Sequence, residues 1–125
     1  MELRELVGVP FVYGGEEISG CDCYGLVKLY YKNFTNIKLE DIKYTRESEL
    51  EAFKKELENG SKFYEVVSLD VNDLLVFLYN GKNVHFGVAV KEGLMLMSTP
   101  KTGSVLVNSK LWSKKVYKIL RYKNV

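Results

Sequence analysis

Several residue types are scarce in this sequence, and their scarcity limits the kinds of site it can build. The 125 residues include one histidine, two cysteines, two prolines and one tryptophan. Cys21 and Cys23 are one residue apart, too close for an ordinary disulfide in regular backbone, so we expect two free thiols. With a single histidine the chain lacks the ligands of a four-coordinate zinc site unless several carboxylates join, and we expect no metal.

The sequence also lacks a targeting segment, a long apolar run and a large net charge. Residues 1–6 have neither the basic start nor the apolar core of a signal peptide, and no stretch approaches the length of a membrane span. A formal net charge of +2 is too small to indicate nucleic-acid binding. We therefore expect a chain synthesised in the cytoplasm, with no nucleic-acid partner and no membrane span.

Charge is nevertheless distributed unevenly along the chain. The C-terminal region is basic and contains no acid, whereas residues 47–58 are rich in glutamate. We interpret both regions as solvated faces rather than as binding sites for a charged partner. The basic side chains in question are Lys110, Lys114, Lys115, Lys118, Arg121 and Lys123.

The composition is that of a folded protein, with 46% hydrophobic and 27% charged residues. Its length suits one core, so residues 1–125 are predicted to form a single domain. Glycines between residues 8 and 20 indicate an irregular loop. From Tyr24 to Phe34 apolar residues recur at helical spacing, and Asp22 is a suitable N-cap. This pattern places Cys23 at the N-terminus of a helix.

The remainder of the chain predicts one more helix and then strands. Ser48 and Glu51 match a capping box, which indicates a helix that ends before Gly60. Helices followed by an antiparallel meander indicate an α+β fold, with N-terminal helices packed on a sheet of five or six strands. The predicted strands are 63–67, 73–79, 84–90, 94–98, 104–107 and 115–122.

Cys23 and His85 are the residues with the clearest chemical potential. A thiol in the first turn of a helix meets the positive end of the helix dipole and unpaired N–H groups, which favour the thiolate and supply donors for an oxyanion. His85, the sole histidine, is predicted to share a strand face with Asn83 and Gly87. We expect the small Gly87 to leave space there for substrate or for the cysteine-bearing helix.

Each residue also has a structural interpretation. Cys23 alone fits a small apolar residue at the start of a core helix as well as it fits a nucleophile. A lone strand histidine is more often an incidental surface residue than a catalytic base. Taken together, a thiol at a helix start and a downstream imidazole match the pair that cysteine hydrolases need.

Three blocks of the sequence, in order, resemble the NlpC-type peptidase superfamily. The first, residues 8–27, is similar to an aromatic P-Y-x-x-G-G loop that leads into G-x-D-C-S-G-L-V. The second, residues 73–90, is similar to the G-D-L-x-F-F and H-x-G-I-Y-x-G strands. The third, residues 94–112 with the basic-aromatic strand after them, is similar to the C-terminal end. Tyr24, where most members have serine, resembles the phage tail-tip branch.

The resemblance implies a papain-like fold and assigns the catalytic pair. Cys23 is then the nucleophile and His85 the general base and acid, with no cofactor. Two positions depart from the family pattern. Met97 stands where a histidine, asparagine or glutamine usually follows the catalytic histidine, and Phe11 stands where a tyrosine usually precedes the cysteine. The candidates to replace these groups as orienting or oxyanion support are Thr99, Asn83 and Tyr13.

These observations predict a cysteine hydrolase that cleaves an amide bond in the stem peptides of bacterial cell wall. The alternative, favoured by Met97 and Phe11, is a catalytically weakened phage tail or assembly module that keeps the fold as a binding domain. A third interpretation is an acyltransferase on a related scaffold. The expected partners are stem peptides and phage tail proteins, and the expected location is a virion tail or the cell wall after delivery.

Overall fold

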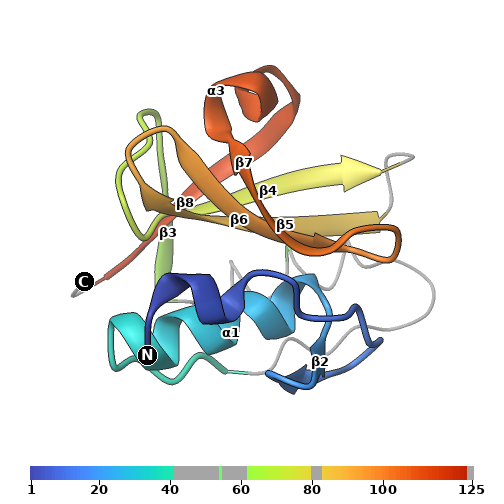
Figure 1. Ribbon diagram of the computed structural model, residues 1–125. Helices are drawn as coiled ribbons and strands as arrows, with labels where there is room; N and C mark the ends of the chain where they lie inside the picture. The colour runs from blue at the N-terminus through green and yellow to red at the C-terminus, as the bar shows by residue number, and fades with distance from the viewer. Residues whose placement is uncertain (41–53, 55–61, 80–82, 124–125) are drawn as a thin grey trace.

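Six antiparallel strands form the central sheet, in the order β3-β8-β4-β5-β6-β7. The computed structural model describes residues 1–40, 54, 62–79 and 83–123. Helix α1 lies against one face of the sheet and the short helix α3 lies on the other face (Figure 1). This architecture confirms the α+β fold with a six-stranded antiparallel sheet.

The elements follow one another in a simple order along the chain. A 3-10 turn η1 (Leu3–Leu6) precedes a two-stranded ribbon and helix α1 (Cys23–Phe34), and the sheet strands come after them. The ribbon consists of β1 (Glu16–Glu17) and β2 (Gly20–Cys21). The sheet strands and the elements between them are β3 (Phe63–Val66), β4 (Leu74–Tyr79), β5 (Asn83–Lys91), β6 (Leu94–Thr99), β7 (Gly103–Asn108), α3 (Ser109–Trp112), η2 (Ser113–Lys115) and β8 (Val116–Tyr122).

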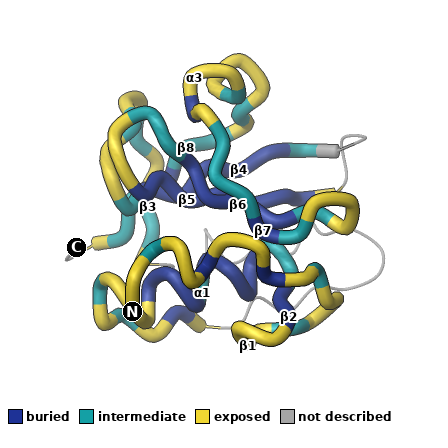
Figure 2. Tube along the Cα trace, viewed as in Figure 1, coloured by how far each residue is buried: buried dark blue, intermediate teal, exposed yellow. Residues whose placement is uncertain are grey.

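Alternating side chains of the sheet build two cores, one on each face. The inner core joins α1 to the sheet through residues such as Leu26, Phe86 and Leu96. The outer core lies on the opposite face, where Trp112 of α3 packs over Phe77 with ring centroids 5.6 Å apart. Figure 2 shows buried positions along both α1 and the central strands. The sheet is therefore covered on both faces.

The sequence predicted every sheet strand to within one residue at each end. The helix predicted from Ser48 lies outside the described residues, apart from residue 54. Three short elements were not predicted: the β1-β2 ribbon, α3 and η2. All three are made of two to four residues, too short to show a hydrophobic period.

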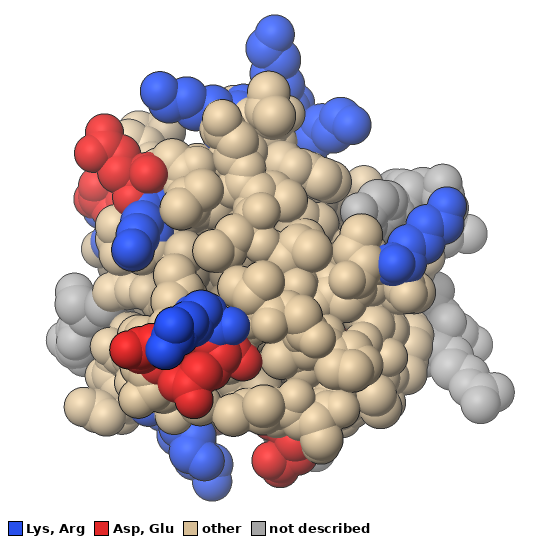
Figure 3. All heavy atoms as spheres, in the orientation of Figure 1, with Lys and Arg blue, Asp and Glu red and all other residues tan. Residues whose placement is uncertain are grey.

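The basic C-terminal region divides into an exposed part and a partly buried part. Lys110, Lys114 and Lys115 are exposed, and lysine side chains project from the α3 end of the molecule in Figure 3. Arg121 is different, because its guanidinium donates two hydrogen bonds of 2.9 Å to the carboxylate of Asp73, which is 1% exposed. The interpretation as a solvated face is thus wrong for Arg121, which neutralises a buried acid.

Within the described residues, no helix is both long and apolar enough to cross a membrane.

Candidate active site

Asp22 fixes the start of α1 and the loop before it. One carboxylate oxygen, Oδ1, accepts a hydrogen bond from the Gly25 N–H at 2.7 Å, which caps the helix as predicted. The other, Oδ2, accepts from the Gly14 N–H at 3.0 Å. Because the same side chain binds both segments, Cys23 begins the helix at a position that the glycine loop also defines.

The loop and the helix start approach each other very closely. A Cβ atom added to Gly25 would lie 2.0 Å from the Gly15 carbonyl oxygen, and one added to Gly15 would lie 2.5 Å from the Gly20 carbonyl oxygen. These distances are far below van der Waals contact, so neither position accepts a side chain without movement of the backbone. The glycines therefore allow the loop to pack on the first turn of α1.

Cys23 lies in a cleft at the end of the sheet where β5 begins and β6 ends. The cleft has a volume of about 300 Å³. All five residues predicted for the site line it, together with aromatic and apolar neighbours. The lining residues are Phe11, Tyr13, Asp22, Cys23, Tyr24, Asn83, Val84, His85, Ser98, Thr99 and Pro100.

His85 lines the cleft from the outer-core side of β5. It stands directly opposite Phe77 in the β4-β5 register, and the two ring centroids are 5.9 Å apart. Its neighbours in sequence, Val84 and Phe86, belong to the inner core under α1. The predicted alternation along this strand is therefore confirmed. His85 lines the cleft from the outer-core face of the sheet, whereas Cys23 packs on the inner core.

The prediction that Gly87 leaves open space beside His85 is wrong. A Cβ at Gly87 would lie 2.5 Å from the sulfur of Met95, so this methionine already fills the room on that face. Met95 is fully buried in the outer core. The small residue serves strand packing and not the entry of a substrate.

Burial controls the protonation of His85. The residue is 5% exposed, and this desolvation lowers the pKa of the imidazole to about 4. At neutral pH the ring is therefore uncharged and has a lone pair to accept a proton. A neutral ring suits a general base that receives the proton of a thiol.

The three candidate supporting residues lie in different settings around the cleft. Tyr13 is 83% exposed at the rim, with its ring 6.0 Å from that of Phe11. Asn83 is exposed at the first position of β5. The hydroxyl of Thr99 lies 2.7 Å from that of Thr102 and accepts the Thr102 N–H, so it closes the turn after β6.

The two departures from the family pattern have distinct positions. Met97 is 2% exposed in the outer core and does not line the cleft. Phe11 lines the cleft, where its ring contributes an apolar wall. Cys21 is fully buried in the inner core, and burial raises the pKa of its thiol to about 11, as expected of a buried filler. Neither cysteine forms a disulfide.

Sequence reasoning missed Ser98. This residue lines the cleft from β6, and its side chain is fully buried. Its signal in the sequence was a polar residue at the end of the apolar strand Leu94–Thr99, next to the position the family comparison had singled out.

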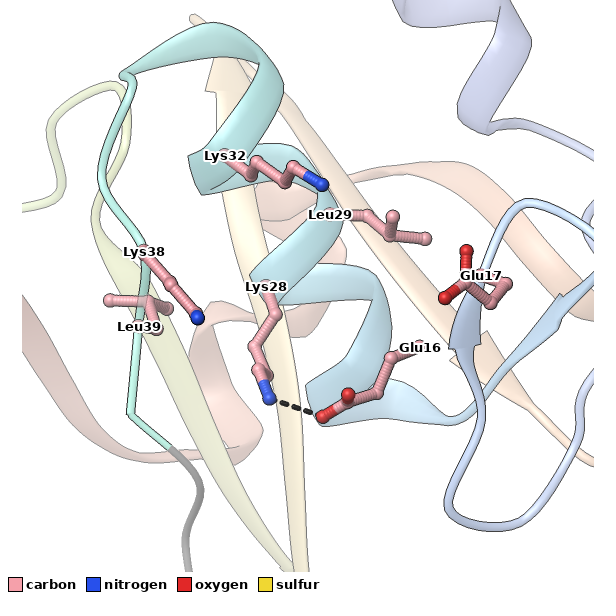
Figure 4. Close-up of a pocket in the computed structure, with 7 residues that line it drawn as sticks. All are labelled: Glu16, Glu17, Lys28, Leu29, Lys32, Lys38 and Leu39. Atoms are coloured by element: carbon pink, nitrogen blue, oxygen red, sulfur yellow. Dashed lines mark hydrogen bonds and ion pairs between the residues drawn. The ribbon is translucent and has the colours of Figure 1, made fainter.

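A second hollow, of about 320 Å³, is lined by β1, α1 and the segment after α1. Figure 4 shows lysines from α1 and from the segment after it around this hollow, with an ion pair between Lys28 and Glu16. Its lining contains no thiol, hydroxyl or imidazole, so it offers no nucleophile. The residues that line it are Glu16, Glu17, Lys28, Leu29, Lys32, Lys38 and Leu39.

Proteins of similar sequence and structure bear out the family resemblance. A probable endopeptidase of Haemophilus influenzae is 28% identical over 122 residues, which span 94% of this chain and 69% of that protein. The NlpC/p60 domain of the peptidoglycan hydrolase SagA superposes with a TM-score of 0.62 at 21% identity, covering 94% of this chain and 91% of that domain.

Two longer proteins share the fold. An NLP/P60-family protein of Staphylococcus aureus, described as similar to a lipoprotein, has a TM-score of 0.62 at 18% identity and is matched over 43% of its length. An NlpC/P60 family protein of Bacillus cereus has a TM-score of 0.61 at 18% identity and is matched over 40% of its length. The papain-like fold expected from the resemblance is thereby confirmed. Since residues 8–121 match the NlpC/P60 family model, the chain belongs to the NlpC/P60 family.

Proposed function

We propose that this chain is a cysteine hydrolase that cleaves an amide bond in the stem peptides of bacterial cell wall, with Cys23 as nucleophile and His85 as base and acid. One observation carries the proposal: the first residue of α1 and the sole histidine line the same cleft. Membership of a family of peptidoglycan hydrolases supports the choice of substrate.

The proposed reaction proceeds through an acyl-enzyme. The imidazole of His85 takes the thiol proton as the sulfur of Cys23 bonds to the amide carbon, and helix-start N–H groups stabilise the oxyanion. The C–N bond then breaks, and the proton passes to the departing amine. A water molecule next gives a proton to the imidazole and bonds to the same carbon. The C–S bond breaks, the proton returns to sulfur, and a carboxylic acid is released.

The burial of His85 is consistent with this role. A ring whose pKa is about 4 is unprotonated in the resting enzyme, so it is ready to accept the thiol proton. No metal or organic cofactor takes part in the proposed steps. Tyr13, Asn83 and Thr99 are the proposed supporting groups at the rim.

Mass spectrometry of stem peptides provides the test. Purified wild type should convert a tetrapeptide stem into two fragments, and Cys23→Ala should leave it intact. Cys21→Ala is the matched control, because it removes the other thiol, which is buried away from the cleft, and should retain cleavage. Identical fragment patterns from wild type and Cys23→Ala would end the proposal.

A second candidate function is a binding module of a phage tail with little or no turnover. The position of Met97 in the outer core favours it, because a thioether packed there provides no polar group to orient His85. Alkylation by iodoacetamide separates the two functions. An active site should alkylate rapidly near pH 6, whereas a decayed one should react as ordinary cysteine does, near pH 8.5.

The biological setting proposed with either function is a phage tail or delivery to the cell wall. Tyr24 is the residue that motivates the phage branch, and in the structure it has a packing role: its hydroxyl donates to the Glu40 carbonyl at 2.7 Å. Proteomic analysis of purified tail particles, compared with the cell-wall fraction, tests this setting. Absence of the chain from tail particles would contradict the phage assignment.

A further inference from the structure

We infer that Ser98 is a positioning residue of the Cys23 site, whose hydroxyl donates a hydrogen bond to the sulfur when the thiol ionises. The inference rests on the proposed role of Cys23 as nucleophile. It begins from an unusual feature: the side chain of Ser98 is fully buried, and its Oγ has no hydrogen-bond partner among the described residues. Burying a hydroxyl in this way opposes folding, so the residue calls for an explanation.

The alternation of side chains along β6 places this hydroxyl on the face of the sheet that α1 and Cys23 cover. Side chains alternate along β6, where Leu96 belongs to the inner core under α1 and Met97 to the outer core. Ser98 therefore faces α1, which packs against β5 and β6. Cys23 packs on the same inner core. Thr99 points to the other face and binds Thr102.

Ser98 and Cys23 line the same cleft at the start of α1. Both residues line it, one from the end of β6 and one from the first helical position. A neutral thiol is a weak hydrogen-bond acceptor, whereas a thiolate is a strong one. A hydrogen bond from a nearby hydroxyl is therefore strongest when the sulfur is charged.

Ser104 provides an internal comparison. It is the direct cross-strand partner of Ser98 and is also fully buried. Its hydroxyl, however, accepts the Val9 N–H at 2.7 Å, which fastens the N-terminal segment to β7. The two serines thus share burial, strand setting and size. They differ because the hydroxyl of Ser104 accepts a hydrogen bond in the resting structure, whereas that of Ser98 has no partner among the described residues.

The test is the pH dependence of Cys23 alkylation by iodoacetamide, read by mass spectrometry at the labelled residue. Ser98→Ala should raise the pH midpoint of labelling by about one unit, which is about a tenfold loss of rate on the acid side. Ser98→Thr, which keeps a hydroxyl, should have the wild-type midpoint. Ser98→Val, which has nearly the shape of the threonine variant but no hydroxyl, should have the raised midpoint of Ser98→Ala. Cys23→Ala measures the background from Cys21.

Thermal unfolding distinguishes this role from a structural one. Ser98→Ala should unfold at the same temperature as wild type or higher, because it removes a buried hydroxyl that has no partner in the resting fold. Ser104→Ala should unfold at a lower temperature and keep the wild-type labelling midpoint. An unchanged midpoint in both Ser98→Ala and Ser98→Val would overturn the inference. Loss of the Cys23 requirement for peptide cleavage would instead overturn the proposed function.

Discussion

His85 shows how the environment of one residue sets its chemistry. Its position opposite Phe77, at the margin of the outer core, removes water from the ring and lowers the pKa to about 4. Protonation would place a positive charge in this buried setting, which costs desolvation energy. The neutral form of the ring therefore dominates at physiological pH. The imidazole is therefore uncharged at neutral pH, and two pH effects follow.

The first effect concerns the rate. The acid limb of the kcat/KM profile that reports His85 should have its midpoint near pH 4, well below the 6.5 of an exposed histidine, because the neutral ring is the reactive form. A pH–rate series from pH 3.5 to 8 on a stem peptide checks this. An acid limb centred near 6.5 would show that the imidazole is solvated in the working enzyme.

The second effect concerns stability. Because the pKa of His85 is lowered in the fold, its contribution is fully present above pH 6.5 and is lost as the pH falls toward 4. The unfolding free energy of wild type should drop over this window by about 3 kcal/mol more than that of His85→Gln. Urea titrations of both proteins at pH 7 and pH 4 provide the measurement. Parallel losses in the two proteins would contradict the burial argument.

The position of helix α1 depends on the close packing of its first turn against the glycine loop. Gly25→Ala should destabilise the fold by about 2 kcal/mol or more, because the added Cβ meets the Gly15 carbonyl at 2.0 Å. Activity per folded molecule should fall as well, since Cys23 lies two residues earlier. Lys32→Ala, an exposed position on the same helix, is the control and should change stability by less than about 0.5 kcal/mol. Equal stability of the two variants would show that the glycine loop moves to accommodate the added Cβ without a loss of stability.

The strands and the cysteine-bearing helix were predictable because their patterns are local. The period of two fixes each strand face, and Asp22 ahead of an apolar repeat marks the start of α1. The use of Gly87 was mispredicted because its neighbour, Met95, comes from the next strand. The role of Ser98 was hidden for the same reason: burial and the loss of hydrogen-bond partners arise from tertiary packing.

Across the whole molecule, ion pairs of Arg121 join the last strand to the loop before β4. Arg121 contacts both Asp70 and the buried Asp73, so it connects residues 48 or more apart in sequence. Arg121→Met should lower the unfolding free energy by more than Arg4→Met does, because Asp73 is left buried without its cation. Arg4→Met, which breaks the exposed pair with Glu2, should change it by less than about 1 kcal/mol. Similar values for both would show that Asp73 finds another partner or water.

The proposed mechanism requires two residues 62 positions apart in the sequence to act in one cleft through a covalent intermediate. The most direct test is rapid-quench mass spectrometry of the intact protein during turnover of a stem peptide. We expect a transient adduct with the mass of the acyl fragment on Cys23, absent in Cys23→Ala and formed far more slowly in His85→Gln. Cleavage of the peptide with no adduct on Cys23, or with an adduct on another residue, would contradict it.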